Sequence, residues 1–198
     1  MTALSRWTIG LLVVGSVACR DAAAPRPPAS ASAATRAAFD QAAPGDDGGV
    51  RASGRGVYSL AGLDVQFAFE AAQTPGETIG RFHQRLDEGG GLVIDFDARV
   101  TCLAVDAVNH RAWVAGVVTK NESTDPDYRA DINQPGQDVW FRMLDAEETP
   151  GAIDRSTFLG FKGAAGIQTS AAYCAARLWA PNNARTWPVT AGDITVRP

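Results

Sequence analysis

The amino-acid sequence predicts an all-β protein built as a single antiparallel meander. Residues 63–70 alternate apolar and polar side chains with the period of two that a half-buried strand requires. Short apolar runs recur along the rest of the chain between turns rich in glycine, such as residues 87–91. No long segment has helical periodicity, and we expect one short helix near the C-terminus, at residues 170–178, where Thr169 or Ser170 can cap its start.

The predicted strands follow one another as hairpins. Their ranges are 54–60, 63–70, 77–86, 92–96, 99–105, 112–119, 138–144 and 193–197. The runs 99–105 and 112–119 are continuously apolar, which indicates central strands that are covered on both faces. Consecutive hairpins of this kind form either a small closed β-barrel or a two-sheet β-sandwich. We favour the barrel, because closure removes exposed strand edges.

The N-terminal residues 1–19 are typical of an export signal rather than of the fold. Arg6 supplies a short positive region, and residues 7–15 form an apolar run that is too short to cross a bilayer. Residues 16–19, Ser-Val-Ala-Cys, resemble the lipobox of bacterial lipoproteins. In such signals the peptide is cut before the cysteine, here Cys19, and acyl chains such as palmitate then anchor the protein in the membrane. The alternative is an ordinary secretory signal, cut near Ala18, which gives a soluble secreted product.

The rest of the chain divides into a tether and a β-domain. Residues 20–50 are rich in alanine and proline and carry too little apolar bulk to repay the entropy of ordering, so we interpret them as a disordered tether. Residues 51–198 form the predicted β-domain. The whole chain has a formal net charge of −4, with 22 acidic and 18 basic side chains. No basic field is available to attract the phosphates of nucleic acid, so we expect no nucleic-acid partner.

Three cysteines occur in the sequence, Cys19, Cys102 and Cys174. Since Cys19 belongs to the signal, Cys102 and Cys174 remain as an even pair in the β-domain. In an exported protein such a pair is most simply a disulfide. The bond would fasten the short C-terminal helix to the central strand that carries Cys102. The alternative is a reactive thiol or a metal ligand, which no neighbouring histidine or C-x-x-C spacing supports.

The sequence offers few candidates for a catalytic base or a metal site. We expect His83 in a solvent-facing strand position and His110 in a turn, and no G-x-S-x-G motif supplies a nucleophile. Acidic residues crowd the loop after Lys120, but Arg129 takes the third ligand position of an EF-hand, so the calcium-binding pattern fails. These acidic residues are Glu122, Asp125, Asp127 and Asp131. We therefore expect neither a metal nor a cofactor.

A pair of carboxylates gives the sequence its one candidate for enzymatic chemistry. Asp95 and Asp97 lie two residues apart on a predicted strand and hence on one face of the sheet, with Glu70 or Asp64 across from them. Two carboxylates facing each other are what glycoside cleavage uses. The same pattern is also typical of any polar sheet face.

Tryptophans near the C-terminus are candidate ligand contacts. Trp179 and Trp187 flank residues 180–186, a turn-rich loop. Exposed aromatic side chains beside such a loop can stack on a sugar or a peptide, although packing in the core is the alternative. Trp113 and Trp140 fall within predicted strands, and we expect both in the core.

Several loose motifs recur along the β-domain. They are Gly54-Arg-Gly56, Phe67-Ala-Phe69 before a glycine turn, and the runs 100–106, 112–119 and 138–141. On these motifs the chain from about residue 52 to residue 196 resembles a group of uncharacterised exported bacterial proteins, and its β-domain is similar to the post-COAP type. The resemblance implies an extracellular β-domain and supplies no activity, cofactor or catalytic residue.

Together these observations favour a non-enzymatic surface module in the cell envelope. It would be held to the membrane by its lipid and would bind an extracellular ligand or an envelope protein. One alternative is a carboxylate-dependent hydrolase acting on glycans. Another is a lipocalin-like carrier of a small apolar ligand, which requires an open barrel interior that Phe67, Phe69, Val114 and Val117 do not fill.

Overall fold

The computed structural model describes residues 49–130, 134–146, 151–161 and 166–198. The predicted signal with Cys19, and the predicted tether up to residue 48, lie outside the described residues. The elements are β1 (Val50–Leu60), β2 (Leu63–Thr74), β3 (Glu77–Gly89), β4 (Leu92–Asp106), β5 (Arg111–Asn121), α2 (Pro126–Ala130), β6 (Asp138–Leu144), β7 (Arg155–Ser156), β8 (Gly160–Phe161), α3 (Ser170–Ala176), the 3-10 helix η2 (Pro181–Asn183) and β9 (Trp187–Arg197).

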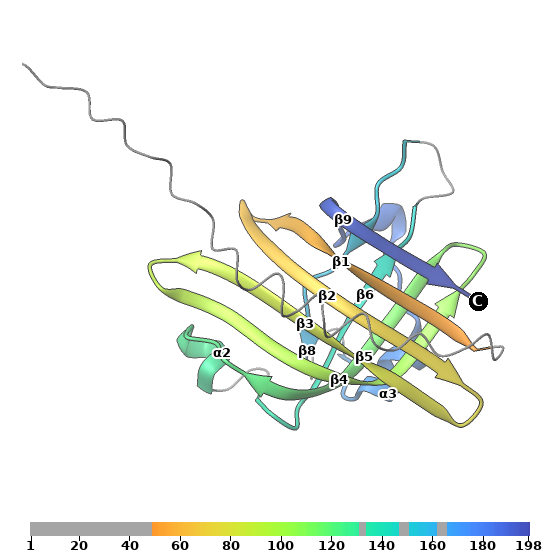
Figure 1. Ribbon diagram of the computed structural model, residues 1–198, viewed down its shortest axis with the longest axis horizontal. Coiled ribbons are helices and arrows are strands. Elements are labelled where there is room, and N and C mark those ends of the chain that lie inside the picture. The colour runs from red at the N-terminus through yellow and green to blue at the C-terminus, as the bar shows by residue number, and fades with distance from the viewer. Residues whose placement is uncertain (1–48, 131–133, 147–150, 162–165) are drawn as a thin grey trace, which may run out of the picture. The chain divides into compact units, whose positions relative to one another are not determined.

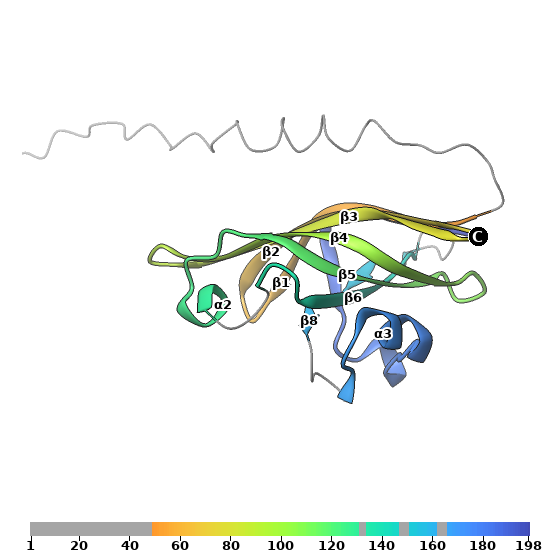
Figure 2. The same cartoon turned by 90° about the horizontal axis from the view of Figure 1, so that it is seen from below.

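The strands form a meander that closes into a barrel (Figure 1). The order is β5-β4-β3-β2-β1-β9-β7-β6, and the pairing of β5 with β6 completes the ring. The result is a closed eight-stranded antiparallel barrel with one extra strand, β8, which pairs with β6. Figure 2 shows α3 beneath β5 and β6, on the outside of the barrel. The predicted all-β fold, with a barrel rather than a sandwich and a short helix near the C-terminus, is therefore confirmed.

Some boundaries differ from those that the sequence predicts. β4 is one continuous strand, where we expected separate strands at 92–96 and 99–105. The alternation of β4 continues through residues 97 and 98, since Phe96, Ala98 and Val100 are all buried. The register shift against β5 at this point leaves Thr119 of β5 without a partner and does not end β4. The two-residue strands β7 and β8 and the single-turn helix α2 were not predicted, since so few residues carry no detectable periodicity.

The interior of the barrel is filled with apolar side chains. Phe69 from β2 and Phe82 from β3 both meet Phe141 from β6 edge-on, with ring centroids 5.3 and 5.0 Å apart. A lipocalin-like carrier requires an interior that is not filled by side chains. Phe67, Phe69 and Val114 are buried in this core and fill it. Val118 faces inward in place of Val117, because alternate residues of β5 point into the barrel.

Two glycines of β1 make room for this core. Gly54 pairs with Phe69 and Gly56 with Phe67 on the adjacent strand. A Cβ atom at Gly54 would lie 2.8 Å from Cε1 of Phe69, and one at Gly56 would lie 2.3 Å from the backbone oxygen of Ala191. Without side chains at these positions, the phenyl rings and the backbone of β9 approach β1 closely.

Carboxylate side chains accept backbone hydrogen bonds next to β7, where the barrel has few strand-to-strand hydrogen bonds. β7 pairs with β6 and with β9 over only two residues each. Beyond this short ladder, Asp154 accepts hydrogen bonds from the amides of Ala146 at 2.9 Å and Ile194 at 2.7 Å, and Asp145 accepts one from the amide of Val196 at 2.9 Å. Side-chain oxygens thus satisfy amides of β9 that a longer neighbouring strand would otherwise satisfy.

We predict that Gly56→Val destabilises the barrel, because its side chain must displace the backbone of β9 and the ring of Phe67. Overpacking of this kind lowers the free energy of unfolding by about 1–3 kcal/mol. Ser53→Val is the matched control, since Ser53 lies on the same strand but is exposed, and we expect a change within about 0.5 kcal/mol. Urea unfolding of both variants measures the difference, and equal midpoints would contradict the assigned packing.

Candidate functional site

A second, smaller core lies on the outside of the barrel. Trp113 and Ala115 of β5 and Trp140 of β6 face outward and are buried beneath Tyr173 and Cys174 of α3. The Trp140 and Tyr173 rings are stacked with centroids 5.4 Å apart. β5 is consequently buried on both faces, as its continuous apolar run predicts. We call residues 166–186 the covering segment. It contains α3, which overlies β4, β5 and β6 (Figure 2).

The predicted disulfide fastens the covering segment to the barrel. Cys102 of β4 and Cys174 of α3 are joined across 72 residues of sequence, with Cα atoms 6.3 Å apart. The bond connects α3 to the strand next to β5, as the sequence indicated.

Hydrogen bonds hold the segment on either side of the disulfide. At the start of α3, the amide of Ser170 donates to Oδ1 of Asp138 at 2.8 Å, and its hydroxyl donates to the backbone oxygen of Gly116 at 2.8 Å. After α3, Nε1 of Trp113 donates to the backbone oxygen of Leu178 at 2.9 Å. These contacts, together with the disulfide, fix the position of the residues that follow Leu178.

Trp179, one of the two candidate ligand contacts, lies half-buried at the edge of the covering segment. Its ring is edge-on to Trp113 with centroids 5.8 Å apart, and its Nε1 donates to Oδ1 of Asn183 at 2.9 Å. The guanidinium groups of Arg111 and Arg142 lie 4.6 and 5.4 Å from the ring centroid, within the range of cation–π contacts. Trp179 is therefore the centre of a rigid cluster of aromatic and cationic groups.

Trp187, the other candidate, belongs to the interior of the barrel. Its ring is stacked on Tyr58 with centroids 6.1 Å apart, and it packs at the edge of the main core. Just before it, Thr186 accepts hydrogen bonds from Arg155 at its hydroxyl and its backbone oxygen, at 2.8 and 2.7 Å. Only Trp179 of the pair is placed with the arginine cluster.

Sequence reasoning missed Arg111 and Arg142. The signal was nonetheless in the strands, since Arg111 and Trp113 on β5, and Trp140 and Arg142 on β6, are two residues apart and share the outer face. The covering segment brings Trp179 onto that face, and nothing in the local sequence around residue 179 indicates this contact.

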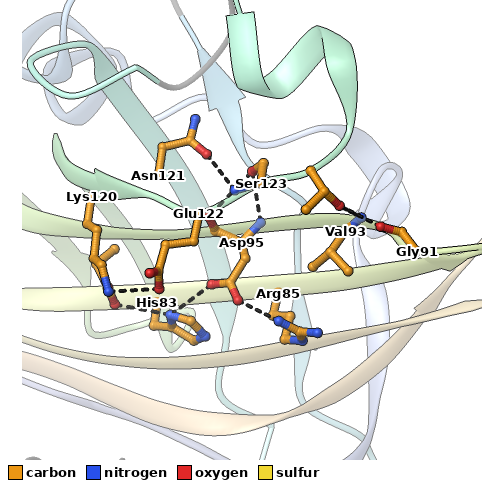
Figure 3. Close-up of polar contacts among 11 residues, drawn as sticks. His83, Arg85, Gly91, Val93, Asp95, Lys120, Asn121, Glu122 and Ser123 are labelled. Atoms are coloured by element: carbon orange, nitrogen blue, oxygen red, sulfur yellow. Dashed lines mark hydrogen bonds and ion pairs between the residues drawn. The ribbon is translucent and has the colours of Figure 1, made fainter.

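The candidate carboxylates lie elsewhere on the outer surface, in a network of cross-strand ion pairs (Figure 3). Nη1 of Arg85 donates to Oδ2 of Asp95 at 2.6 Å. Nδ1 of His83 lies 3.0 Å from Oδ1 of Asp97 and 3.8 Å from Oδ1 of Asp95. Beside them, Lys120 pairs with Glu122 at 2.7 Å. Asp95 and Asp97 do share one face, as predicted, and both contact the same imidazole.

The same register organises the neighbouring charges. On β2, Glu70 lies opposite Arg81 of β3, with 3.3 Å between Oε1 and Nε. Asp64 instead lies opposite Ser59, near the β1–β2 turn, and is not part of the network. Opposite charges in directly paired positions stabilise a sheet surface modestly, so this arrangement is typical of a solvated face.

Asp97 controls the protonation of His83. The hydrogen bond to Asp97 raises the pKa of His83 above 6.5, with help from the charge of Asp95 and against the effects of burial and of Arg85. The reciprocal hydrogen bond lowers the pKa of Asp97. A carboxylate hydrogen-bonded to an imidazole is one part of the arrangement that general acid–base chemistry uses.

The acidic loop after Lys120 is used to build local structure. Oδ1 of Asp125 accepts hydrogen bonds from the amides of Asp127 and Tyr128, both at 3.1 Å, at the start of α2. Asp131 lies outside the described residues. Within the ranges that the structure covers, no three His, Cys, Asp or Glu side chains are grouped as a metal ion would require.

In the described part of the chain, no helix is both long and apolar enough to cross a membrane. No family model, curated protein or solved structure matches this chain. The resemblance to exported bacterial proteins with a post-COAP-type domain therefore stays a prediction.

We predict that removing the disulfide with Cys102→Ala and Cys174→Ala lowers the free energy of unfolding by about 2–4 kcal/mol, because the bond restricts a long loop of the unfolded chain. The barrel core does not involve either cysteine, so far-ultraviolet circular dichroism should keep its β signature while limited proteolysis cuts the covering segment first. Wild-type protein treated with reductant should behave like the double variant. Unchanged stability and an unchanged cleavage pattern would contradict the structural role of the bond.

We also predict that His83 titrates above 6.5 and that Asp97→Asn lowers its pKa, as measured by NMR of the imidazole carbons. A raised histidine pKa stabilises the fold fully below pH 6.5, and this contribution is lost as the pH rises through the folded-state value. The difference in unfolding free energy between wild type and His83→Gln should therefore shrink as the pH rises above 6.5 and through the folded-state pKa of His83. A His83 pKa at or below 6.5, or one that Asp97→Asn leaves unchanged, would contradict the assigned contact.

Proposed function

We propose that this protein is a bacterial surface lipoprotein whose β-barrel is a non-enzymatic binding or envelope-interaction module. Support for the anchor comes from Arg6, the apolar run 7–15 and the lipobox-like residues 16–19. Acylated Cys19 holds the protein at the membrane, and the alanine- and proline-rich segment lets the barrel reach away from it.

The filled interior of the barrel is the observation that carries the binding proposal. Because Phe67, Phe69 and Val114 occupy the space inside, a ligand or partner approaches the outer surface. The filled interior also argues against a lipocalin-like carrier, which needs a cavity. On the outer surface, we propose the half-buried ring of Trp179 and its two arginines as the contact residues.

A carboxylate-dependent hydrolase is the second candidate function. It is favoured by the contact of Asp95 and Asp97 with one imidazole, since the three groups together could donate and accept protons. Against it, Asp95 is already engaged by Arg85 at 2.6 Å, and its other oxygen faces His83, so neither oxygen is free to contact a substrate.

Metabolic labelling tests the anchor. We expect labelled palmitate to enter the wild-type protein and not Cys19→Ser, and we expect Cys19→Ser to move from the membrane fraction to the soluble exported fraction. Cys102→Ala is a control, since it removes a cysteine that belongs to the disulfide and should keep the label. Equal labelling of the wild type and Cys19→Ser, or the same location for both, would overturn the lipoprotein proposal.

A panel of glycans and peptides separates binding from hydrolysis. We expect saturable binding without turnover, weakened by Trp179→Ala by about tenfold or more and unchanged in Asp95→Asn. Trp187→Phe serves as a control, because Trp187 packs against the core. Turnover in the wild type that Asp95→Asn abolishes would establish the hydrolase instead.

A further inference from the structure

Two arginines flank Trp179 on neighbouring strands of the barrel. Arg142 of β6 lies opposite Trp113 of β5, and Arg111 lies opposite Leu144, so the two arginines are diagonal neighbours across the β5–β6 pair. Both point outward, and both guanidinium groups reach the ring of Trp179. The closed barrel and the hydrogen-bonded Trp179 therefore hold two positive charges side by side.

Neither guanidinium forms an ion pair with a carboxylate of the described residues. Within the described residues, no ion pair involves Arg111 or Arg142, whereas Arg81 and Arg85 on the other side of the barrel are both paired. Asp106 of β4 lies directly opposite Arg111, and its pKa is lowered mainly by Asn109 and less by the charge of Arg111. Its carboxylate accepts hydrogen bonds from Asn109 at 2.7 and 3.1 Å and forms no ion pair with Arg111.

The hydrogen-bonding capacity of these arginines is also incompletely used. Nε of Arg111 and Nε of Arg142 are buried and have no partner among the residues described. Arg142 makes one long bond from Nη2 to the backbone oxygen of Ala184, at 3.4 Å, and also contacts the hydroxyl of Tyr173. Burial of part of a guanidinium costs hydration, and this cost is recovered when an anion accepts its remaining N–H groups.

Nearby groups add to the positive field and keep it in place. Arg155 of β7 is anchored to Thr186 at the end of the covering segment, and Arg177 donates from Nη1 to the backbone oxygen of Val105 at 3.4 Å. Trp179 is fixed through Asn183 and Trp113. A local cluster of arginines is notable in a chain whose net charge is −4.

We propose that Arg111 and Arg142, held against Trp179, bind an oxyanion: a phosphate, sulfate or carboxylate group carried by an extracytoplasmic ligand. The inference deepens the proposed binding function and rests on it. The planar fork of N–H donors on arginine matches the oxygens of such a group, and two forks on adjacent strands can share one group or bind two oxygens of it. Because the arginines already occupy the surroundings of the Trp179 ring, a charged group fits this site better than a neutral sugar that needs the ring for stacking.

Titration of the full chain tests this site, with Cys19→Ser in every sample so that lipid is not a variable. The probes are inorganic phosphate, inorganic sulfate, glucuronate and glucose 6-phosphate, with glucose as the neutral control, at constant ionic strength. We expect saturable binding of at least one anion and none of glucose. The indole Nε1–H signal of Trp179 and the Nε–H signals of the two arginines should shift in NMR spectra as the anion binds.

The variants assign the binding to the two arginines. Arg142→Gln and Arg111→Gln should each weaken anion binding about tenfold or more, the loss expected for a charge-assisted hydrogen bond. Arg142→Lys keeps the charge and loses the fork, so its affinity should be intermediate. Arg55 lies at an exposed position of β1, so Arg55→Gln makes the same change in net charge and should leave anion binding unchanged.

Thermal unfolding of each variant separates loss of the site from loss of the fold. If Arg142→Gln does not fold, Arg111→Gln and Arg142→Lys carry the test. The inference is overturned if no anion binds the wild type, or if Arg55→Gln weakens binding as much as the cluster variants do. A different result overturns the proposed binding function itself: neither the anions nor the neutral glycans and peptides of the panel bind.

Discussion

The outer face of β5 carries Trp113 and Ala115, and closing the barrel leaves this face in water unless another segment covers it. An eight-stranded barrel buries only the inward face of each strand, so a strand that is apolar on both faces requires a second layer. The covering segment supplies this layer, and the bond between Cys102 and Cys174 keeps it in place. The position of the covering segment determines which side chains around Trp179 are exposed to solvent.

The two sides of the barrel consequently differ in chemistry. On β2, β3 and β4, acidic and basic side chains lie in directly paired positions, and their charges largely cancel. On β5 and β6, the covering segment displaces water from the aromatic side chains and leaves Arg111 and Arg142 at its edge without carboxylate partners in the described structure. Because the rings around Phe141 fill the interior, the binding function that we propose requires the outer surface.

Much of the fold could be predicted because it follows from patterns within short stretches of the sequence. Alternation predicts the strands, the apolar run 112–119 predicts that β5 is buried on both faces, and the even cysteine pair predicts the disulfide. The rest depends on contacts between distant residues. Asp97 and Ala98, which we expected to separate two strands, continue β4, and β7 and β8 are too short to have a period. Trp179 and Trp187 look equivalent in the sequence, since each lies beside the same turn-rich loop. In the folded barrel, Trp179 lies beside Arg142, whereas Trp187 is stacked on Tyr58.

We propose that recognition takes place on the outer surface at the edge of the covering segment, through Arg111 and Arg142, which form no ion pair within the described residues. Anomalous diffraction from crystals of the full chain grown with selenate, an oxyanion analogue, tests this most directly. We expect an anomalous peak within hydrogen-bonding distance of the guanidinium groups of Arg111 and Arg142, and we expect no such peak in crystals of Arg142→Gln. Selenate bound only at other surfaces, or an empty site beside Trp179 in the wild type, would contradict it.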